Sequence, residues 1–294
     1  MDLVAIYAID ILGAIAILAL LSVGLAVVFG MMKIINLAHG EFMMLGGYVA
    51  ILATNQWGVP IWISMLVLAP LIVGIFGVLV EHLLVRHLYG RMIDTMLATW
   101  GLSLAVIGLA TMVFGNTTVG ISSPLGGITV GARQASGYTL FLIALAAGVM
   151  VALWCLLRFT DFGLRARACM QNAAMANALG MNPNGVYKMT FGLGAALSGL
   201  AGAVLAPLTG VIPTIGAAYI AKAFITVISG GSAVIAGTVS ASGFFGAVSQ
   251  GVTFLATPVY GQVALLLAAI VLIRLLPQGI TGRFFKRAIR CVYL

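Results

Sequence analysis

The segment "ILGAIAILALLSVGLAVVFGMM", residues 11–32, contains 22 residues without a charge. An α-helix rises 1.5 Å per residue, so about 20 apolar residues suffice to cross the hydrocarbon core of a bilayer. Further uncharged runs follow at residues 42–80, 95–132, 134–157, 189–221 and 223–273. This pattern predicts a protein built from membrane-spanning helices.

The composition agrees with a membrane protein. The 294 residues are 63% hydrophobic and 7% charged, and the mean hydropathy is +1.20. A soluble domain carries about 25% charged residues, so a soluble fold of this composition would have nothing to cover its surface. We expect one all-α domain over residues 1–294, a polytopic transmembrane bundle of about eight or nine spans, some broken or re-entrant. The predicted spans are 10–31, 42–54, 61–84, 94–114, 138–157, 189–208, 217–230, 233–255 and 259–276.

Other sequence features exclude several kinds of segment and site. Asp2 and Asp10 are the only charged residues among the first ten, whereas a cleavable signal peptide begins with basic residues. Cys155, Cys169 and Cys291 have no paired spacing, which indicates neither a disulfide framework nor a metal site. Methionine is frequent but usually fills cores. We therefore expect no metal and no cofactor in this chain.

The distribution of Lys and Arg predicts the orientation, because short loops rich in these residues stay in the cytoplasm. With the N-terminus outside the cytoplasm, Arg133 is the one basic residue placed outside, and Lys222 falls within a span. The other basic residues lie inside: Lys33, Arg86, Arg91, Arg158, Arg165, Arg167, Lys188, Arg274, Arg283, Lys286, Arg287 and Arg290. The net charge of +8 thus suits anionic lipid, and its spread over several loops argues against nucleic-acid binding.

Residues 158–188 form a polar segment longer than a turn. Residues 164–179 are rich in helix-favouring types, and Gly180 and Pro183 are typical of a helix end. Two interpretations are open: an amphipathic helix at the lipid surface, or a docking element for a soluble partner. The second cytoplasmic segment, residues 277–294, is a basic tail.

The stretch "INLAHGEF", residues 35–42, places polar groups between two apolar runs. A buried charged pair costs several kcal/mol unless it is hydrogen-bonded, and non-helical backbone at membrane depth must face protein or water. Asn36, His39 and Glu41 therefore either tie a re-entrant turn together or line the transport path.

Glycine is unusually frequent, at 37 residues. Small residues recur in "GLGAALSGLAGAVLA" (192–206) and "GTVSASGFFGAVSQG" (237–251), which favours close helix crossings in lipid. The stretch "ISGGSAVIAG" (228–237) predicts a second break, of the kind from which transporters build sites.

Five stretches occur along the chain in a characteristic order: "GLAVVFGMMKIINLAHGEFMMLGGY" (24–48), "FGLRARACMQNAAMANALGM" (162–181), "MTFGLGAALSGLAGAVLAP" (189–207), "KAFITVISGGSAVIAG" (222–237) and "PQGITGR" (277–283). Together they resemble the membrane permeases of bacterial ABC importers for branched-chain amino acids, a family that includes urea and short-amide permeases. The resemblance covers nearly the whole chain.

The resemblance implies a bacterial inner-membrane subunit that works with a second related permease, two cytoplasmic ATP-binding subunits and a periplasmic solute-binding protein. The chain has no GxxxxGK[ST] motif, so ATP would be hydrolysed on the partners and the chain itself is not an enzyme. The resemblance also makes 164–181 the segment that couples to the ATPase. Its expected contacts are polar at Arg165, Arg167, Gln171 and Asn172, and apolar at Ala168, Met175 and Leu179.

The sequence does not decide which solute of the family this chain transports. The stretches "NLAHGEFMMLG" and "LATWGLSL" (97–104) resemble the urea-type permeases, whereas "KAF" at 222–224 resembles the amino-acid type. Lys222 would either attract a substrate carboxylate or extend to the membrane interface. A secondary carrier or a channel is the alternative from another class, because hydropathy does not separate these from an ABC permease.

Overall fold

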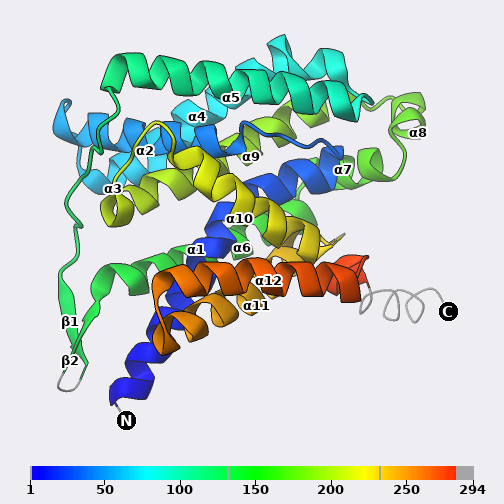
Figure 1. Ribbon diagram of the computed structural model, residues 1–294. Helices are drawn as coiled ribbons and strands as arrows, with labels where there is room; N and C mark the ends of the chain where they lie inside the picture. The colour runs from blue at the N-terminus through cyan, green and yellow to red at the C-terminus, as the bar shows by residue number, and fades with distance from the viewer. Residues whose placement is uncertain (1, 131–132, 232, 283–294) are drawn as a thin grey trace. The chain divides into compact units, whose positions relative to one another are not determined.

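The helices of this protein follow its uncharged runs. The computed structural model describes residues 2–130, 133–231 and 233–282. Within this part, every segment predicted to span the membrane coincides with one helix or with consecutive helices (Figure 1). The elements are α1 (Asp2–Met32), α2 (His39–Asn55), α3 (Ile61–Ile63), the π-helix η1 (Ser64–Leu68), α4 (Ala69–Leu83), the 3₁₀-helix η2 (Val85–Leu88), α5 (Met92–Phe114), β1 (Gly127–Val130), β2 (Arg133–Ser136), α6 (Gly137–Phe159), α7 (Asp161–Gln171), α8 (Ala173–Ala178), α9 (Pro183–Thr209), α10 (Ile215–Gly230), α11 (Val234–Leu255) and α12 (Pro258–Leu275).

Six helical segments of the described chain are long and apolar enough to cross a membrane. They comprise α1, the run α3–η1–α4, α5, α6, α9 and the segment that begins with α12. A bent pair, α10 with α11, makes a seventh if it counts as one span. Helix α2 has 17 residues and is shorter than these. The protein is therefore a multi-pass helical membrane protein, and the count of eight or nine spans stays a prediction.

The chain divides into two compact units that are interleaved in sequence. The larger unit consists of Val23–Ser122 and Val151–Ala221. The smaller unit consists of Met1–Ser22, Ser123–Met150 and Lys222–Leu294. The expectation of one permease domain over residues 1–294 stays a prediction.

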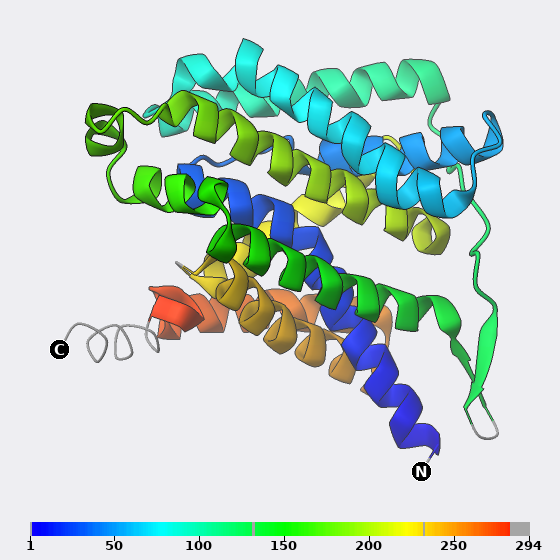
Figure 2. The same ribbon diagram turned by 180° about the vertical axis from the view of Figure 1, so that it is seen from behind.

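The core of the larger unit lies where α2, α4 and α9 meet. The ring of Phe42 on α2 meets Phe76 of α4 and Phe191 of α9 edge to face, with centroids 5.8 and 6.0 Å apart. Helix α4 runs alongside α9 (Figure 2). Most of α9 is buried, so this helix is the centre of the unit.

Glycines allow the helices of this core to approach closely. A Cβ atom on Gly24 would lie 2.5 Å from the carbonyl oxygen of Gly194. A side chain at Gly46 on α2 would collide with the backbone of Gly199 on α9. A side chain at Gly202 on α9 would collide with the backbone of Met43 on α2. Packing of this kind drives helix association in lipid, as the small-residue stretches predicted.

The outer helices of the larger unit present apolar faces that suit contact with lipid. Large apolar side chains that are exposed lie on both α4 and α5. They include Leu71, Ile75 and Leu79 on α4, and Leu97, Leu104, Leu109 and Met112 on α5. In water this surface would promote aggregation, whereas in a bilayer it is the expected lipid-facing surface.

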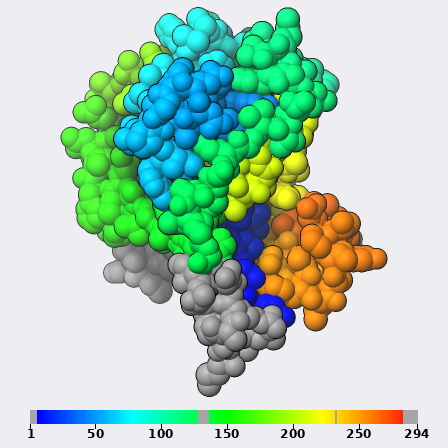
Figure 3. All heavy atoms as spheres, turned by 90° about the vertical axis from the view of Figure 1, so that its left-hand side faces the viewer, coloured from blue at the N-terminus to red at the C-terminus, as the bar shows by residue number. Residues whose placement is uncertain are grey.

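Residues 55–60 form the turn predicted between the second and third spans. Residues 55–58 are exposed, and Gly58 adopts φ +64°. The end of α2 and this turn lie on the surface in light blue (Figure 3). Nearby in the same unit, Val119 and Val211 exchange two backbone hydrogen bonds of 3.0 and 2.8 Å, which join the loops after α5 and α9.

In the smaller unit, α11 packs along α12 and the chain breaks between α10 and α11. The two helices at this break are bent by 115°. Thr281 donates a 2.6 Å hydrogen bond to the carbonyl of Gly230, and Gly231 adopts φ +88°. The predicted break within 228–237 is therefore present. The sequence did not predict the hairpin β1–β2, in which Gly127 pairs with Ser136.

Candidate functional site

The turn between α1 and α2 is held together by side chains of the larger unit. The Asn36 side chain accepts a 3.0 Å hydrogen bond from the backbone N–H of Ala38, which closes a tight turn. The N–H of Leu37 donates to Thr99 Oγ1 on α5 at 3.1 Å. Lys33, the residue that follows α1, has its backbone in the left-handed region, with φ +56°. The backbone N–H groups of Leu37 and Ala38 are thus satisfied by side chains of the protein.

His39 begins α2 and connects it to α9. Its Nδ1 lies 3.0 Å from Ser198 Oγ, and this hydroxyl donates to the carbonyl of Gly194 at 2.7 Å. A hydroxyl has one proton, so both contacts are satisfied when Nδ1 of the ring carries a hydrogen and donates it to Ser198. The imidazole is buried, at 2% exposure.

Glu41 is buried in the first turn of α2 and is turned toward α5. Its carboxylate hydrogen-bonds the side chain of Ser103. The second carboxylate oxygen, Oε2, has no hydrogen-bond partner among the described residues. A carboxylate near a helix N-terminus is favoured by the helix dipole, yet its burial remains costly.

The structure thus brings together three of the four residues predicted for the path or the re-entrant turn. Asn36, His39 and Glu41 lie within six positions of sequence and are all buried. Lys222 belongs to the smaller unit, on α10, where it is half-buried and its carbonyl accepts a 2.8 Å hydrogen bond from Thr226 Oγ1. The hydrogen bonds support the turn-forming role, and a role in the path stays a prediction.

The segment 158–188 contains two short helices where the sequence predicted one over 164–179. Helix α7 ends because Asn172 adopts an extended conformation, with φ −158° and ψ 100°. The Asn172 side chain then caps α8 by accepting a 3.0 Å hydrogen bond from Met175 N–H. Gly180, with φ +83°, and Pro183, the first residue of α9, end the segment as predicted.

The two faces of α7–α8 differ in burial. Ala166, Cys169 and Ala176 are buried against the unit. Burial raises the pKa of the Cys169 thiol, which keeps it protonated and inert. Met175 and Leu179 are 58% and 72% exposed, so apolar side chains point away from the protein.

The residues predicted to couple to an ATPase lie on or beside that outward face. Arg165, Arg167, Gln171, Asn172, Met175 and Leu179 are exposed, and Ala168 is half-buried. Arg167 also has an internal partner, because its guanidinium donates to the carbonyl of Leu157 at the end of α6. A cavity of about 540 Å³ adjoins this face and is lined by Phe162, Arg165, Leu179, Met181, Asn182 and Met189 among others. Within the described residues, no group of three or more His, Cys, Asp and Glu could hold a metal ion.

A protein family described as "Branched-chain amino acid transport system / permease component" matches residues 7–276. The chain belongs to this family. No solved structure matches this permease with significance.

Several relatives of the permease cover nearly its whole length. The high-affinity branched-chain amino acid transport system permease protein LivH of Escherichia coli K12 is 29% identical over 282 residues, which are 90% of this chain and 91% of that protein. BraD of Pseudomonas aeruginosa, whose name describes the same kind of permease, is 30% identical over 293 residues, with the same two shares. A probable branched-chain amino acid transport permease protein LivH of Methanocaldococcus jannaschii is 27% identical, covering 92% of this chain and 90% of the relative.

Sequence reasoning missed the partners of the polar residues in the permease. Ser198 lies in a stretch of small residues and carries no signal of its own. A signal did exist on α5, where Thr95, Thr99 and Ser103 recur at the four-residue spacing that places them on one helix face. All three are buried. Glu81, a buried acid on α4, was also overlooked.

Proposed function

We propose that this chain is one membrane permease subunit of an ABC importer that moves branched-chain amino acids across the bacterial inner membrane. The observation that carries the proposal is the family match over residues 7–276, supported by the six or seven candidate spans. Each of the relatives described above is named as a branched-chain amino acid permease. Their names favour the amino-acid branch over urea or short amides.

The energy for transport comes from two separate ATP-binding subunits. The chain contains no GxxxxGK[ST] motif with which to bind nucleotide itself. We place the docking surface for these subunits on α7–α8. Apolar side chains that face solvent outside the spans mark interaction sites, and Met175 and Leu179 are of this kind. Arg165 beside them adds a charged contact for an acidic partner residue.

The remaining partners are a second related permease and a periplasmic solute-binding protein. The distribution of Lys and Arg supports placing the N-terminus in the periplasm and α7–α8 in the cytoplasm. ATP binding then shifts the permease pair between states that open to the two sides of the membrane. The transport step is mechanical, so no residue of this chain performs chemistry on the solute.

The experiment that tests this function measures uptake by the purified assembly in proteoliposomes. The chain is reconstituted with its companion permease, ATP-binding subunits and binding protein, with ATP on the cytoplasmic side. We expect radiolabelled leucine to accumulate only with hydrolysable ATP, and radiolabelled urea not to accumulate. Uptake of urea alone would move the chain to the other branch of its family, and leucine uptake without any ATPase would make it a carrier.

A further inference from the structure

Glu81 is a second buried acid, and it belongs to a cluster that the proposed function does not yet use. It lies in the last turn of α4 and is 1% exposed. Tyr89, which follows η2, donates its hydroxyl proton to the Glu81 carboxylate. The ring of Tyr89 in turn meets the ring of Tyr187 on α9 edge to face, with centroids 5.1 Å apart and planes at 68°. We call these residues the Glu81–Tyr89–Tyr187 cluster.

Burying the Glu81 carboxylate costs more free energy than burying an apolar side chain that only fills space. Its Oε2 atom has no hydrogen-bond partner among the described residues. Burying a charge with one unsatisfied oxygen is unfavourable, and an apolar side chain of similar volume would avoid the penalty. Burial, together with the hydrogen bond to Glu81 and the charge of Glu81, raises the pKa of Tyr89, so the phenol remains a neutral donor. A costly polar contact of this kind commonly fixes one arrangement of the elements it joins.

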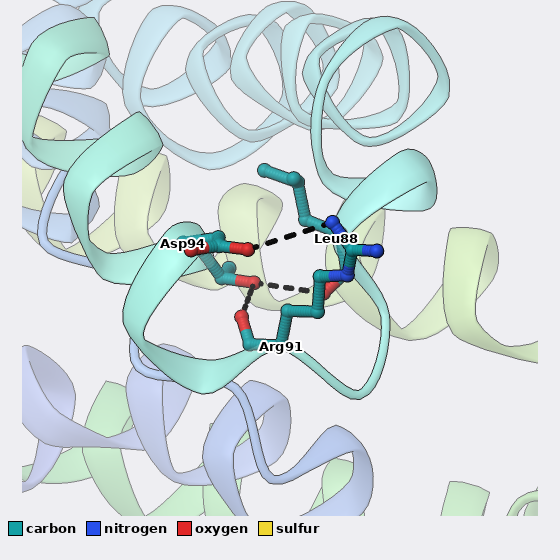
Figure 4. Close-up of polar contacts among 4 residues, drawn as sticks. Leu88, Arg91 and Asp94 are labelled. Carbon is teal, nitrogen blue, oxygen red and sulfur yellow. Dashed lines mark hydrogen bonds and ion pairs between the residues drawn. The ribbon is translucent and has the colours of Figure 1, made fainter.

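On one side the cluster is attached to α5. Tyr89 lies in the linker between η2 and α5, and the buried Thr95 ties that linker to the helix. The single hydroxyl proton of Thr95 is shared between the carbonyl oxygen of Arg91, 2.8 Å from Oγ1, and that of Leu88, 3.1 Å from Oγ1 (Figure 4). Figure 4 also shows the exposed ion pair of Arg91 with Asp94, at 3.8 Å. Tyr89 lies between Leu88 and Arg91, whose carbonyl groups both contact Thr95 on α5. A displacement of Tyr89 therefore moves the start of α5.

On the other side the cluster is attached to α7–α8. Tyr187 lies in the second turn of α9, five residues after Asn182, which caps that helix. Helix α7 packs against α9, and Phe162 of α7 lines the same cavity as Val186, the neighbour of Tyr187 on α9. A displacement of α7–α8 is therefore passed to α9, in whose second turn Tyr187 lies, through the contacts between these helices.

We propose that the Glu81–Tyr89–Tyr187 cluster positions the end of α4 and the start of α5 according to the state of α7–α8. A displacement of α7–α8 acts on Tyr187, whose ring bears on Tyr89. The hydrogen bond from Tyr89 to Glu81 makes the end of α4 follow, and Thr95 makes α5 follow. This inference rests on the proposed function, because a docked ATP-binding subunit is the source of the displacement. A cluster that merely stabilised the fold would change stability and leave coupling intact.

The test measures ATP hydrolysis and leucine uptake in the same proteoliposomes, which contain the complete importer. The decisive variant is Tyr89→Phe, since it removes one hydroxyl and keeps the ring. We expect hydrolysis to continue at the wild-type rate while uptake falls about tenfold, the change expected when one hydrogen bond to a charged group is lost. The ATP consumed per leucine therefore rises by the same factor, a change that a purely structural role does not produce.

Conservative variants separate the ring contact from the hydrogen bond. Tyr187→Phe keeps the ring and is expected to retain the wild-type ratio of ATP to leucine, whereas Tyr187→Leu is expected to raise it. Glu81→Gln keeps a carbonyl acceptor for Tyr89 and should lie between the wild type and Tyr89→Phe. The matched control is Tyr260→Phe, which removes a hydroxyl from an exposed tyrosine on α12 and should change neither rate.

Two outcomes would overturn the inference. One is an unchanged ratio of ATP to leucine in Tyr89→Phe and Tyr187→Leu. The other is a loss of assembly in every cluster variant, Glu81→Gln included, which would make the cluster a structural clamp. A wild-type importer that shows no ATP-dependent leucine uptake would instead contradict the proposed function, so the two failures are distinguishable.

Discussion

Two buried polar pairs hold α2 against its neighbours in the larger unit. His39 contacts Ser198 on α9, and Glu41 contacts Ser103 on α5. In the interior of a membrane protein, water does not compete for these groups, and an unsatisfied group is expensive. The polar turn therefore orients α2 between the central helix α9 and the outer helix α5.

The hydrogen bond between α2 and α9 predicts the effect of Ser198→Ala. Removing a buried partner typically costs about 1–3 kcal/mol, so the melting temperature of the purified permease should fall. The matched control is Ser240→Ala on α11, because that hydroxyl is only partly buried and bonds its own helix at Gly237. Equal melting temperatures for Ser198→Ala and Ser240→Ala would show that the contact with His39 contributes nothing.

Glu41→Gln tests whether the second carboxylate does more than hold the turn. A neutral amide costs less to bury than a charge, so thermal stability should not fall. We expect leucine uptake to drop about tenfold, equivalent to roughly 1.4 kcal/mol, since the unpartnered Oε2 is retained at a cost that packing does not explain. Asp94→Asn, at an exposed ion pair, is the control and should transport normally. If Glu41→Gln changed neither uptake nor stability, the carboxylate would have no special role.

At the scale of the elements, the crossing of α2 and α9 depends on glycine. A Cβ at Gly202 would collide with the carbonyl oxygen, carbonyl carbon and Cα of Met43, and these backbone atoms cannot move aside as the end of a side chain can. The two helices can therefore approach this closely only while that position lacks a side chain.

Gly202→Ala should accordingly force α2 and α9 apart and destabilise the permease by about 1–3 kcal/mol, read as a lower melting temperature. Gly243→Ala on α11 is the matched control, because a Cβ there meets nothing within 4 Å. In a helix interior that change should stabilise by roughly 0.5–1 kcal/mol. The account of the crossing would be wrong if both alanines shifted the melting temperature in the same direction by similar amounts.

Hydropathy predicted the helices well, because the bilayer allows little else than helices over uncharged runs. It did not predict the break at Asn172, where one capping side chain overrides a helix-favouring stretch. The short hairpin β1–β2, which lies around Arg133 between two uncharged runs, was also missed.

The site was predictable in part. Asn36, His39 and Glu41 stood out because polar residues are rare in this chain. Their partners did not, since His39 and Ser198 are 159 positions apart and no periodicity connects them. The Glu81–Tyr89–Tyr187 cluster was likewise not predictable, because it depends on how α4, α9 and the linker before α5 pack together.

At the scale of the whole molecule, the proposed topology predicts which positions are accessible from each side of the membrane. Single cysteines replace Trp57 and Gln171, both exposed, in a background without Cys155, Cys169 and Cys291. A membrane-impermeant thiol reagent should label position 57 in intact cells and position 171 only after permeabilisation. The reverse pattern would invert the topology and remove α7–α8 from the side where ATP is hydrolysed.

The central claim is that a separate ATPase drives this permease through α7–α8. Its most direct test is affinity purification of the tagged chain from native membranes, with partners identified by mass spectrometry. The wild type should recover a subunit that carries a GxxxxGK[ST] motif. The double variant Met175→Ser, Leu179→Ser should no longer recover this subunit. Its melting temperature should equal that of the wild type, since both side chains are exposed. The exposed Leu255→Ser serves as control and should retain the subunit. Wild-type permease that transports leucine yet never recovers a nucleotide hydrolase would contradict the claim.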